Sequence, residues 1–386
     1  MSAAAIFWKR PGVRATLWQG LAIVALVSAA LYLHGNIAEN LPRMKIKLGF
    51  DFLAEVARFE IGENPIGYQA GDSVFKAFAA GLANTIKVAV LGIALTVVLG
   101  TAIALARLSP NRLLSRLAWL YVEVMRNIPL LLQLLFWHTF IVRQLPAPRA
   151  AWTPLPGFFL SNRGLSFPTL EHQTAFDWML AAAVLGCVLT AILWRWARAH
   201  LDRTGQAVPS LSLGLLLISG LVGLAYVVLG EPVSAEIPAL RGFNFIGGGT
   251  LSPEFVALLF ALVTYQAGFA AETIRSGILG VGKGQVETAR SLGLTRGRIM
   301  RLVVLPQALR IVVPPLTSQF LSLTKNSSLA VAVGYPELVR VSSVVTSETG
   351  RAVECIAIIL VIYLTLSLLT AAFMNWFNRR IALRGR

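Results

Sequence analysis

Eight long apolar runs limit the fold of this 386-residue chain more strongly than any other feature. A segment needs roughly 20 mostly apolar residues to cross about 30 Å of hydrocarbon. Lipid offers the backbone no hydrogen-bond partners, so each crossing run must be a helix. The runs cover residues 15–34, 83–106, 117–141, 177–196, 211–229, 254–274, 309–333 and 355–377. The sequence therefore predicts an all-α fold, a polytopic membrane helix bundle of about eight transmembrane helices.

The composition excludes an ordinary soluble protein. Hydrophobic residues make up 56% of the chain and charged residues 13%, and the mean hydropathy is +0.69, values typical of a protein in a lipid bilayer. Cys187 and Cys355 both fall in predicted spans, which favours packing residues over a disulfide or a metal site. The sequence contains no nucleophile–base spacing, so we expect no catalytic residue and no bound metal.

The positions of Lys and Arg predict the orientation of the bundle. These cations gather at Lys9, Arg10, Arg14, Arg107, Arg112, Arg116, Arg195, Arg198 and Arg203, along 275–310, and at Arg379, Arg380, Arg384 and Arg386. The opposite connections hold most of the acids, so we expect both termini in the cytoplasm. A net charge of +16 suggests nucleic acid as an alternative partner, but the cations are spread over every inward connection, and we expect none.

The apolar runs also predict how the chain is divided. Residues 1–76 would hold the first membrane helix and an outer connection, and residues 77–377 the transmembrane domain. Residues 378–386 would form a basic cytoplasmic tail. The first run could be read as a cleaved signal sequence, but its near-bilayer length favours a retained anchor.

One polar segment, after the sixth run, has the most specific pattern. It reads Gly284-Gln285-Val286-Glu287-Thr288-Ala289-Arg290-Ser291-Leu292-Gly293, followed after nine residues by Val303-Val304-Leu305-Pro306. The pattern predicts a short exposed helix, stopped by Gly293 and separated from the next span by Pro306. Ala289 and Gly293 would let another protein approach closely, and Arg290 could pair with its acids. The alternative for Glu287 is an ordinary solvated surface residue.

The residues just before this segment nearly spell a phosphate-binding loop, Gly277-Ile278-Leu279-Gly280-Val281-Gly282-Lys283-Gly284. Such a loop needs a hydroxyl residue after the lysine and a strand before the first glycine. Here Gly284 follows the lysine and a membrane helix precedes. We therefore expect no nucleotide site in this chain.

The spacing in the polar segment resembles the "EAA" loop in permease subunits of ATP-binding-cassette (ABC) importers, with matches at Glu287, Ala289, Gly293, Leu305 and Pro306. Tyr121–Gln133, Glu272–Ile278 and Lys325–Leu329 resemble the polar amino-acid, HisMQ-type branch. The extra spans at about 177–229 and the long outer loops are similar to the Q-type permeases of the Aap and Bzt general L-amino-acid systems.

This resemblance implies a type I ABC importer permease fold and a multi-pass protein of the bacterial inner (cytoplasmic) membrane. It implies three kinds of partner: a paralogous permease subunit that completes a heterodimer, two ATPase subunits that bind ATP and Mg²⁺, and a periplasmic amino-acid-binding protein. The chain itself would hold no cofactor. A coupling loop at about 280–306 would contact an ATPase subunit through Gln285, Glu287, Ala289, Arg290, Gly293, Leu305 and Pro306.

Ionisable residues inside membrane spans are costly and need an explanation. Glu123 with Arg126, and Glu272 with Arg275, lie three residues apart, which predicts two intramembrane ion pairs that brace or gate the inner end. Other polar residues lie nearer midspan and could line a path for a zwitterion, or satisfy one another by hydrogen bonds between helices. They are Gln133, His138, Tyr265, Gln266, Lys325 and Asn326.

Two classes of function remain. The first is the passive permease of an ATP-driven L-amino-acid importer. The alternative is an ion- or proton-coupled secondary transporter of amino acids, for which Asp or Glu at midspan would be expected. None of the predicted spans has one there.

Overall fold

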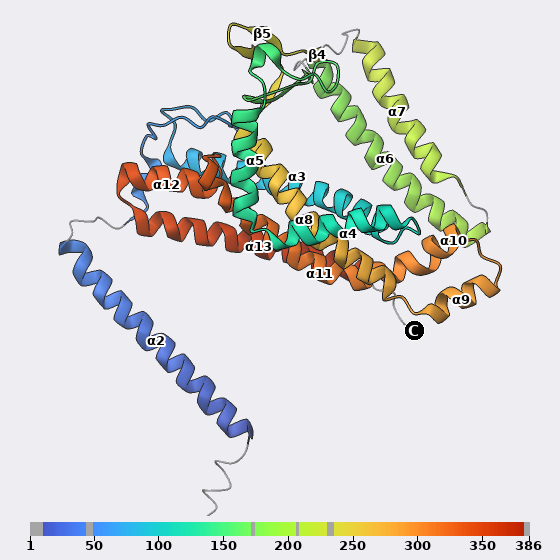
Figure 1. Ribbon diagram of the computed structural model, residues 1–386, viewed down its shortest axis with the longest axis horizontal. Helices are drawn as coiled ribbons and strands as arrows, with labels where there is room; N and C mark the ends of the chain where they lie inside the picture. The colour runs from blue at the N-terminus through green and yellow to red at the C-terminus, as the bar shows by residue number, and fades with distance from the viewer. Residues whose placement is uncertain (1–10, 44–48, 171–173, 206–207, 230–234, 382–386) are drawn as a thin grey trace, which may run out of the picture. The chain divides into compact units, whose positions relative to one another are not determined.

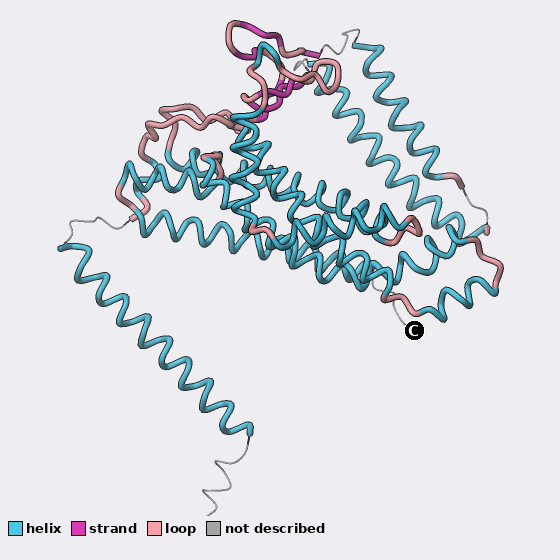
Figure 2. Tube along the Cα trace, viewed as in Figure 1, coloured by secondary structure: helices cyan, strands magenta, loops and turns pink. Residues whose placement is uncertain are grey.

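Helices dominate the computed structural model, which describes residues 11–43, 49–170, 174–205, 208–229 and 235–381 (Figure 1). Strands are confined to a few short pieces (Figure 2), so the predicted all-α fold is confirmed. The long helices are α2 (Pro11–Arg43), α3 (Val74–Arg107), α4 (Arg112–Asn127), α5 (Leu130–Gln144), α6 (Thr174–Thr204), α7 (Ser210–Leu229), α8 (Pro253–Leu279), α11 (Leu305–Asn326), α12 (Leu338–Thr349) and α13 (Ala352–Ile381). The cations Lys9, Arg10, Arg384 and Arg386 used for orientation lie outside the described residues.

Six helices of the described chain are long and apolar enough to cross a membrane, and each overlaps one predicted run. They are Val74–Arg107, Asp177–His200, Ser210–Val228, Pro253–Leu279, Arg296–Val333 and Ala352–Arg380. The first predicted run lies in α2, where Leu17–Leu33 forms a shorter apolar stretch.

The run at 117–141 is not one continuous helix, as the sequence predicted. α4 ends at Asn127 and α5 begins at Leu130, so the two form a broken pair. Pro129 has no N–H to donate and disfavours a helical residue before it, and Ile128 is accordingly extended. The described chain thus has six spans, or up to seven if this pair crosses as one.

The chain divides into two compact units, the first being residues 1–131 with 261–386 and the second residues 132–260. In the first unit, three glycines bring α3 close to three other elements. A Cβ at Gly81 would lie 3.0 Å from Val341 of α12, and one at Gly92 would lie 3.1 Å from Leu323 of α11. A Cβ at Gly100 would lie 2.8 Å from the Cβ of Ala270 in α8. α3 is therefore the helix around which this unit packs.

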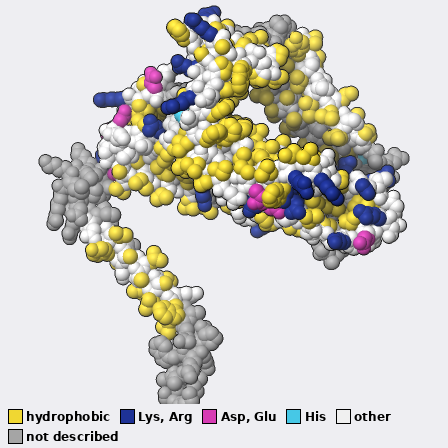
Figure 3. Space-filling view, viewed as in Figure 1, with side chains coloured by type: hydrophobic (Ala, Val, Ile, Leu, Met, Phe, Trp, Pro, Cys, Tyr) yellow, Lys and Arg dark blue, Asp and Glu magenta, His cyan; other side chains and the backbone are white. Residues whose placement is uncertain are grey.

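In the second unit, α6 and α7 form a tight hairpin. A Cβ at Gly186 would lie 3.0 Å from Ile218, and one at Gly214 would lie 2.3 Å from Thr190. The outward faces of both helices are apolar and exposed. Hydrophobic side chains also cover much of the visible surface in the space-filling view (Figure 3), as expected where lipid replaces water.

Short strands lie beside this hairpin in the chain. β1 (Phe159–Ser161), β2 (Gly164–Phe167) and β7 (Gly249–Leu251) form one antiparallel sheet, and β5 (Ala239–Arg241) pairs with β6 (Asn244–Ile246). β3 (Thr169–Leu170) precedes α6 and pairs with β4 (Ala235–Glu236), which follows α7. The sequence did not predict these strands, since each has only two to four residues.

Candidate functional site

The predicted coupling loop contains the short helix that the sequence indicated, α9 (Lys283–Ser291). Gly293 ends it with a φ of +74°, a left-handed conformation that glycine adopts without strain. Gly293 N–H donates to the Arg290 carbonyl at 2.9 Å, and Leu294 N–H donates to the Ala289 carbonyl at 3.2 Å. These two bonds form a Schellman motif, so the backbone itself fixes the end of this helix.

A small hydrophobic cluster holds α9 to the following helices. Ala289 is only 4% exposed and packs with Ile299 of α10 (Arg296–Ile299), Val304 and Ala308. The prediction that Ala289 lets a partner approach is therefore wrong, because its small side chain serves the contact with its own chain. Gln285, Glu287 and Arg290 are exposed on α9, and Leu292 is 75% exposed just after it.

Pro306 does not separate the loop from the next span, contrary to the prediction. α10 continues through a π-helical turn, η3 (Met300–Val304), directly into α11. Leu305 N–H donates to the Met300 carbonyl, five residues back. Pro306 follows with no N–H to donate, so the wider turn accommodates the proline and the helix stays continuous. Lys and Arg side chains gather around α9 and α10 in the space-filling view (Figure 3).

The glycines that resemble a phosphate-binding loop serve helix packing. A Cβ at Gly277 would lie 2.1 Å from a methyl group of Val312, and one at Gly280 would lie 3.2 Å from Ile311. Both neighbours belong to α11, and Gly277 itself lies in α8. Their lack of side chains therefore permits α8 and α11 to meet just before the coupling helix.

One of the two predicted ion pairs is formed. Arg275 donates to Glu272 at 3.0 Å. Glu272 also binds Arg107, the last residue of α3, which the sequence had indicated only as an orientation cation. The expected pair of Glu123 and Arg126 is absent from the described residues. Instead, the Arg126 guanidinium lies 4.9 Å from the centre of the Phe269 ring, and Asn127 donates to the backbone carbonyl of Glu123 at 2.7 Å.

Three of the predicted path residues, Tyr265, Gln266 and Asn326, line one polar cavity of about 310 Å³ between α8 and α11. Phe269, Ser318, Gln319 and Ser322 complete its lining. Gln266 donates to the Gln319 carbonyl at 3.2 Å, and the Gln319 amide donates to Thr273 at 2.7 Å. Lys325 is exposed and is not part of this lining.

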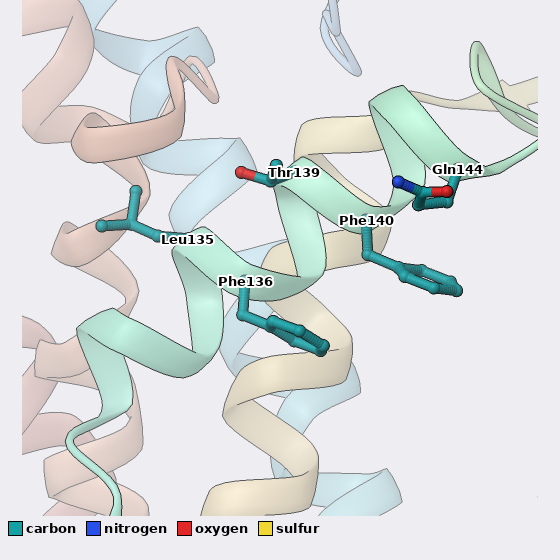
Figure 4. A pocket seen from close by; sticks show the side chains of 5 residues that line it. All are labelled: Leu135, Phe136, Thr139, Phe140 and Gln144. Atoms are coloured by element: carbon teal, nitrogen blue, oxygen red, sulfur yellow. The ribbon is translucent and has the colours of Figure 1, made fainter.

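The other two path residues, Gln133 and His138, belong to α5 and to the second unit. Gln133 is buried. His138 Nε2 lies 3.9 Å from the Glu254 carboxylate of α8, too far for a hydrogen bond. A hollow of about 560 Å³ also runs along α5, where Leu135, Phe136, Thr139, Phe140 and Gln144 line it (Figure 4). Its lining is mostly apolar and includes neither predicted residue, so it is no polar path.

One buried carboxyl escaped the sequence analysis, which counted it among the acids of the outer connections. Glu337 precedes α12 and is completely buried. Its carboxylate accepts hydrogen bonds from the backbone N–H groups of Val339 and Arg340, each at 2.9 Å, and from the Tyr363 hydroxyl at 3.1 Å. Burial raises the pKa of this carboxyl to about 7, against the effect of the three donors. Its position just before an apolar helix was the only feature of the sequence that could have indicated its role at the start of α12.

Comparison of the sequence with known proteins places the chain in a family. Residues 203–383 match the family described as "Binding-protein-dependent transport system inner membrane component". The chain is 45% identical over 97% of its length to the "Putative amino-acid ABC transporter permease protein YhdX" of Escherichia coli, covering 96% of that protein. It is 43% identical over 97% of its length to the "General L-amino acid transport system permease protein AapQ" of Rhizobium johnstonii, covering 94% of it.

A third relative is less similar but also matches nearly the whole chain. The "Glutamate/glutamine/aspartate/asparagine transport system permease protein BztB" of Rhodobacter capsulatus is 36% identical over 95% of this chain, and 93% of it is covered. The predicted resemblance to the Aap and Bzt permeases is thus confirmed over nearly the whole chain.

Proposed function

The chain belongs to the permease subunits of ABC importers for L-amino acids, and from this we propose that it forms one half of a heterodimeric permease. Two separate ATPase subunits would bind ATP and Mg²⁺ and drive transport. A periplasmic binding protein would deliver the amino acid, and the complex would lie in a bacterial inner membrane with both chain termini in the cytoplasm. The chain itself would bind no cofactor.

The coupling helix α9 carries this proposal. It has its own hydrophobic anchor and a backbone-fixed end, yet its polar residues Gln285, Glu287 and Arg290 are exposed. A rigid, exposed polar helix with an apolar residue, Leu292, beside it is suited to a groove on another protein. Since α10, η3 and α11 form one continuous helix, displacement of α9 would pass directly into a membrane span.

The polar cavity between α8 and α11 supports an amino-acid path through this subunit. Tyr265, Gln266 and Asn326 offer hydrogen-bond donors and acceptors inside a span where polar groups are otherwise costly. A neutral zwitterion needs such groups at both of its ends. We propose that amino acids pass this cavity and contact Asn326 in its lining.

The test is purification of the complex in mild detergent, followed by mass spectrometry and reconstitution in vesicles. A second, related permease and an ATPase should co-purify. Uptake into the vesicles should require ATP on the side of the membrane where the ATPase subunits are bound. Uptake driven by an ion gradient without ATPase would instead establish the secondary transporter.

Charge reversal on the coupling helix gives a sharper outcome. Glu287→Arg should lose the ATPase from the purified complex, and with it uptake, while membrane insertion and pairing with the second permease remain. Glu348→Arg, at an exposed glutamate of α12, is the matched control and should keep the ATPase. Retention of the ATPase by both variants would contradict the docking role of α9.

A further inference from the structure

Arg107 forms the only ion pair among the described residues between α3 and α8. Its side chain is 12% exposed, whereas that of Arg275, the second cation on Glu272, is 31% exposed. Arg275 lies three residues from Glu272 on the same helix, so that bond joins α8 to itself. The bond of Arg107 joins two helices.

Close packing surrounds this ion pair. Ala104 of α3, Val122 of α4 and Ala271 of α8 form one buried cluster, with Ile103, Tyr121 and Ile274 packed against it. Gly100, one turn before Ala104 in α3, allows this helix to approach Ala270 of α8 closely. Tyr121 of α4 donates its hydroxyl to the Thr264 carbonyl of α8 at 2.7 Å. The three helices therefore form one block at this end of the unit.

The block is continuous with the coupling helix. Gly277, five residues after Glu272, packs against Val312, and its Cβ would also lie 3.4 Å from the Ala308 carbonyl. Ala308 belongs to the hydrophobic cluster that anchors Ala289 of α9. A packed path thus runs from α9 through α11 to α8, and the Arg107–Glu272 pair extends it to α3.

We infer that Arg107 is a positioning residue for transport, which passes displacement of the coupling helix from α8 to α3 by holding Glu272. This inference rests on the proposed function. Without Arg107, the partly exposed Glu272 would still pair with Arg275, so its carboxylate would keep one cation as a partner. The block would lose only the charged link between α3 and α8, and the coupling helix would still bind the ATPase.

A contiguous path is not by itself proof of coupling, so the test must separate transmission from simple bracing. The measurement is the number of amino acids taken up per ATP hydrolysed, in vesicles containing the complete complex. Arg107→Gln should lower this ratio about fivefold, with ATP hydrolysis and subunit composition close to those of the unchanged complex. Arg275→Gln is the matched control and should leave the ratio unchanged.

A charge exchange provides the rescue. In Arg107→Glu with Glu272→Arg, the carboxylate moves to α3 and still faces a cation on α8, so the ratio should recover relative to Arg107→Glu alone. A brace without a role in transmission would lower the melting temperature and the amount of complex while the ratio stayed constant. That outcome, or a ratio equally reduced in Arg275→Gln, would overturn the inference. Absence of ATP-dependent uptake in the unchanged complex would instead overturn the proposed function.

Discussion

The buried carboxyl of Glu337 makes the stability of this protein depend on pH. Glu337 lies outside the membrane-spanning segments, and burial raises its pKa from 4.5 to about 7. Because the folded state holds this proton more tightly than the unfolded chain does, its contribution to stability is complete below pH 4.5 and is lost as the pH rises through 7. The free energy of unfolding should fall by about 3 kcal/mol over this range, measured by thermal unfolding in detergent at stepped pH.

Glu337→Gln tests this assignment, because the amide keeps the shape of the side chain but does not titrate. The variant should lose most of the pH slope between 4.5 and 7. Glu348→Gln, which changes an exposed glutamate near the end of the same helix, should keep it. An unaltered slope in Glu337→Gln would assign the pH dependence to other groups.

At single positions, the sequence predicted what depends on neighbours in the chain and missed what depends on distant ones. Gly293 was predicted as a helix stop because that role needs only a left-handed residue after a polar helix. Arg107 was missed because its partner Glu272 lies 165 residues away. Ala289 was wrongly predicted to face a partner protein. It is covered by α10 and α11, and nothing in the sequence of α9 indicates that these helices pack on it.

Among the elements, α3 uses glycines for its contacts with three others, and these glycines can be tested individually. Gly100→Leu would force a side chain into the place of Ala270 in α8, where a Cβ alone would lie 2.8 Å from another carbon. We expect a loss of about 1–3 kcal/mol in stability, measured as a lower melting temperature of the purified protein. Uptake should fall as well, because the same contact lies in the block that contains Arg107.

Gly220→Leu is the control for Gly100→Leu, since it makes the same change in α7, where a Cβ would meet nothing within 4 Å. Its melting temperature should stay close to that of the unchanged protein. Equal losses in both variants would mean that helix propensity and hydrophobicity, rather than contact with α8, determine the effect.

Proline had different consequences in two helices, and the sequence did not distinguish them. Pro129 follows an extended Ile128 and ends α4. Pro306 follows a π turn, and the helix continues through it. Both prolines lack an N–H, but whether the preceding turn opens or widens depends on the tertiary contacts of that turn. At Pro306, the anchored residues Ile299 and Val304 hold the turn in place.

For the whole molecule, the α6–α7 hairpin behaves as an insertion. β3 and β4, on either side of it, pair with Thr169 opposite Glu236 and Leu170 opposite Ala235, so a short turn could join them. Deleting residues 171–234 removes two spans and leaves the orientation of every other span unchanged. We expect this variant to insert and to bind the second permease and the ATPase, as measured by co-purification.

Deletion of α7 alone is the matched control, because it removes a single span. The segments after it, including the coupling helix, would then have to face the opposite side of the membrane, and the ATPase should be lost. If the deletion of 171–234 also failed to insert, the hairpin would be part of the folding core.

The sequence predicted the fold of the whole molecule from length and hydropathy, because a bilayer tolerates few alternatives to a helix. Six spans followed directly from those patterns, whereas the coupling helix was predicted from the polar segment at 284–293. The small sheets were not predictable, since strands such as β3, with two residues, carry no periodicity. The polar cavity was predicted only in part, because Ser318 and Ser322 reach it through the rotation of α11, which the sequence does not specify.

The π turn before Pro306 also has a consequence for motion. A π turn can migrate along a helix, because neighbouring carbonyls exchange their donors one at a time. Each step turns only the residue that the π turn passes, by about 100° around the axis. The ring of Pro306 needs the wider turn directly before it, so the π turn is held at Met300–Val304. Displacement of α9 would therefore pass along α10 into α11 without changing which side chains face the neighbouring helices.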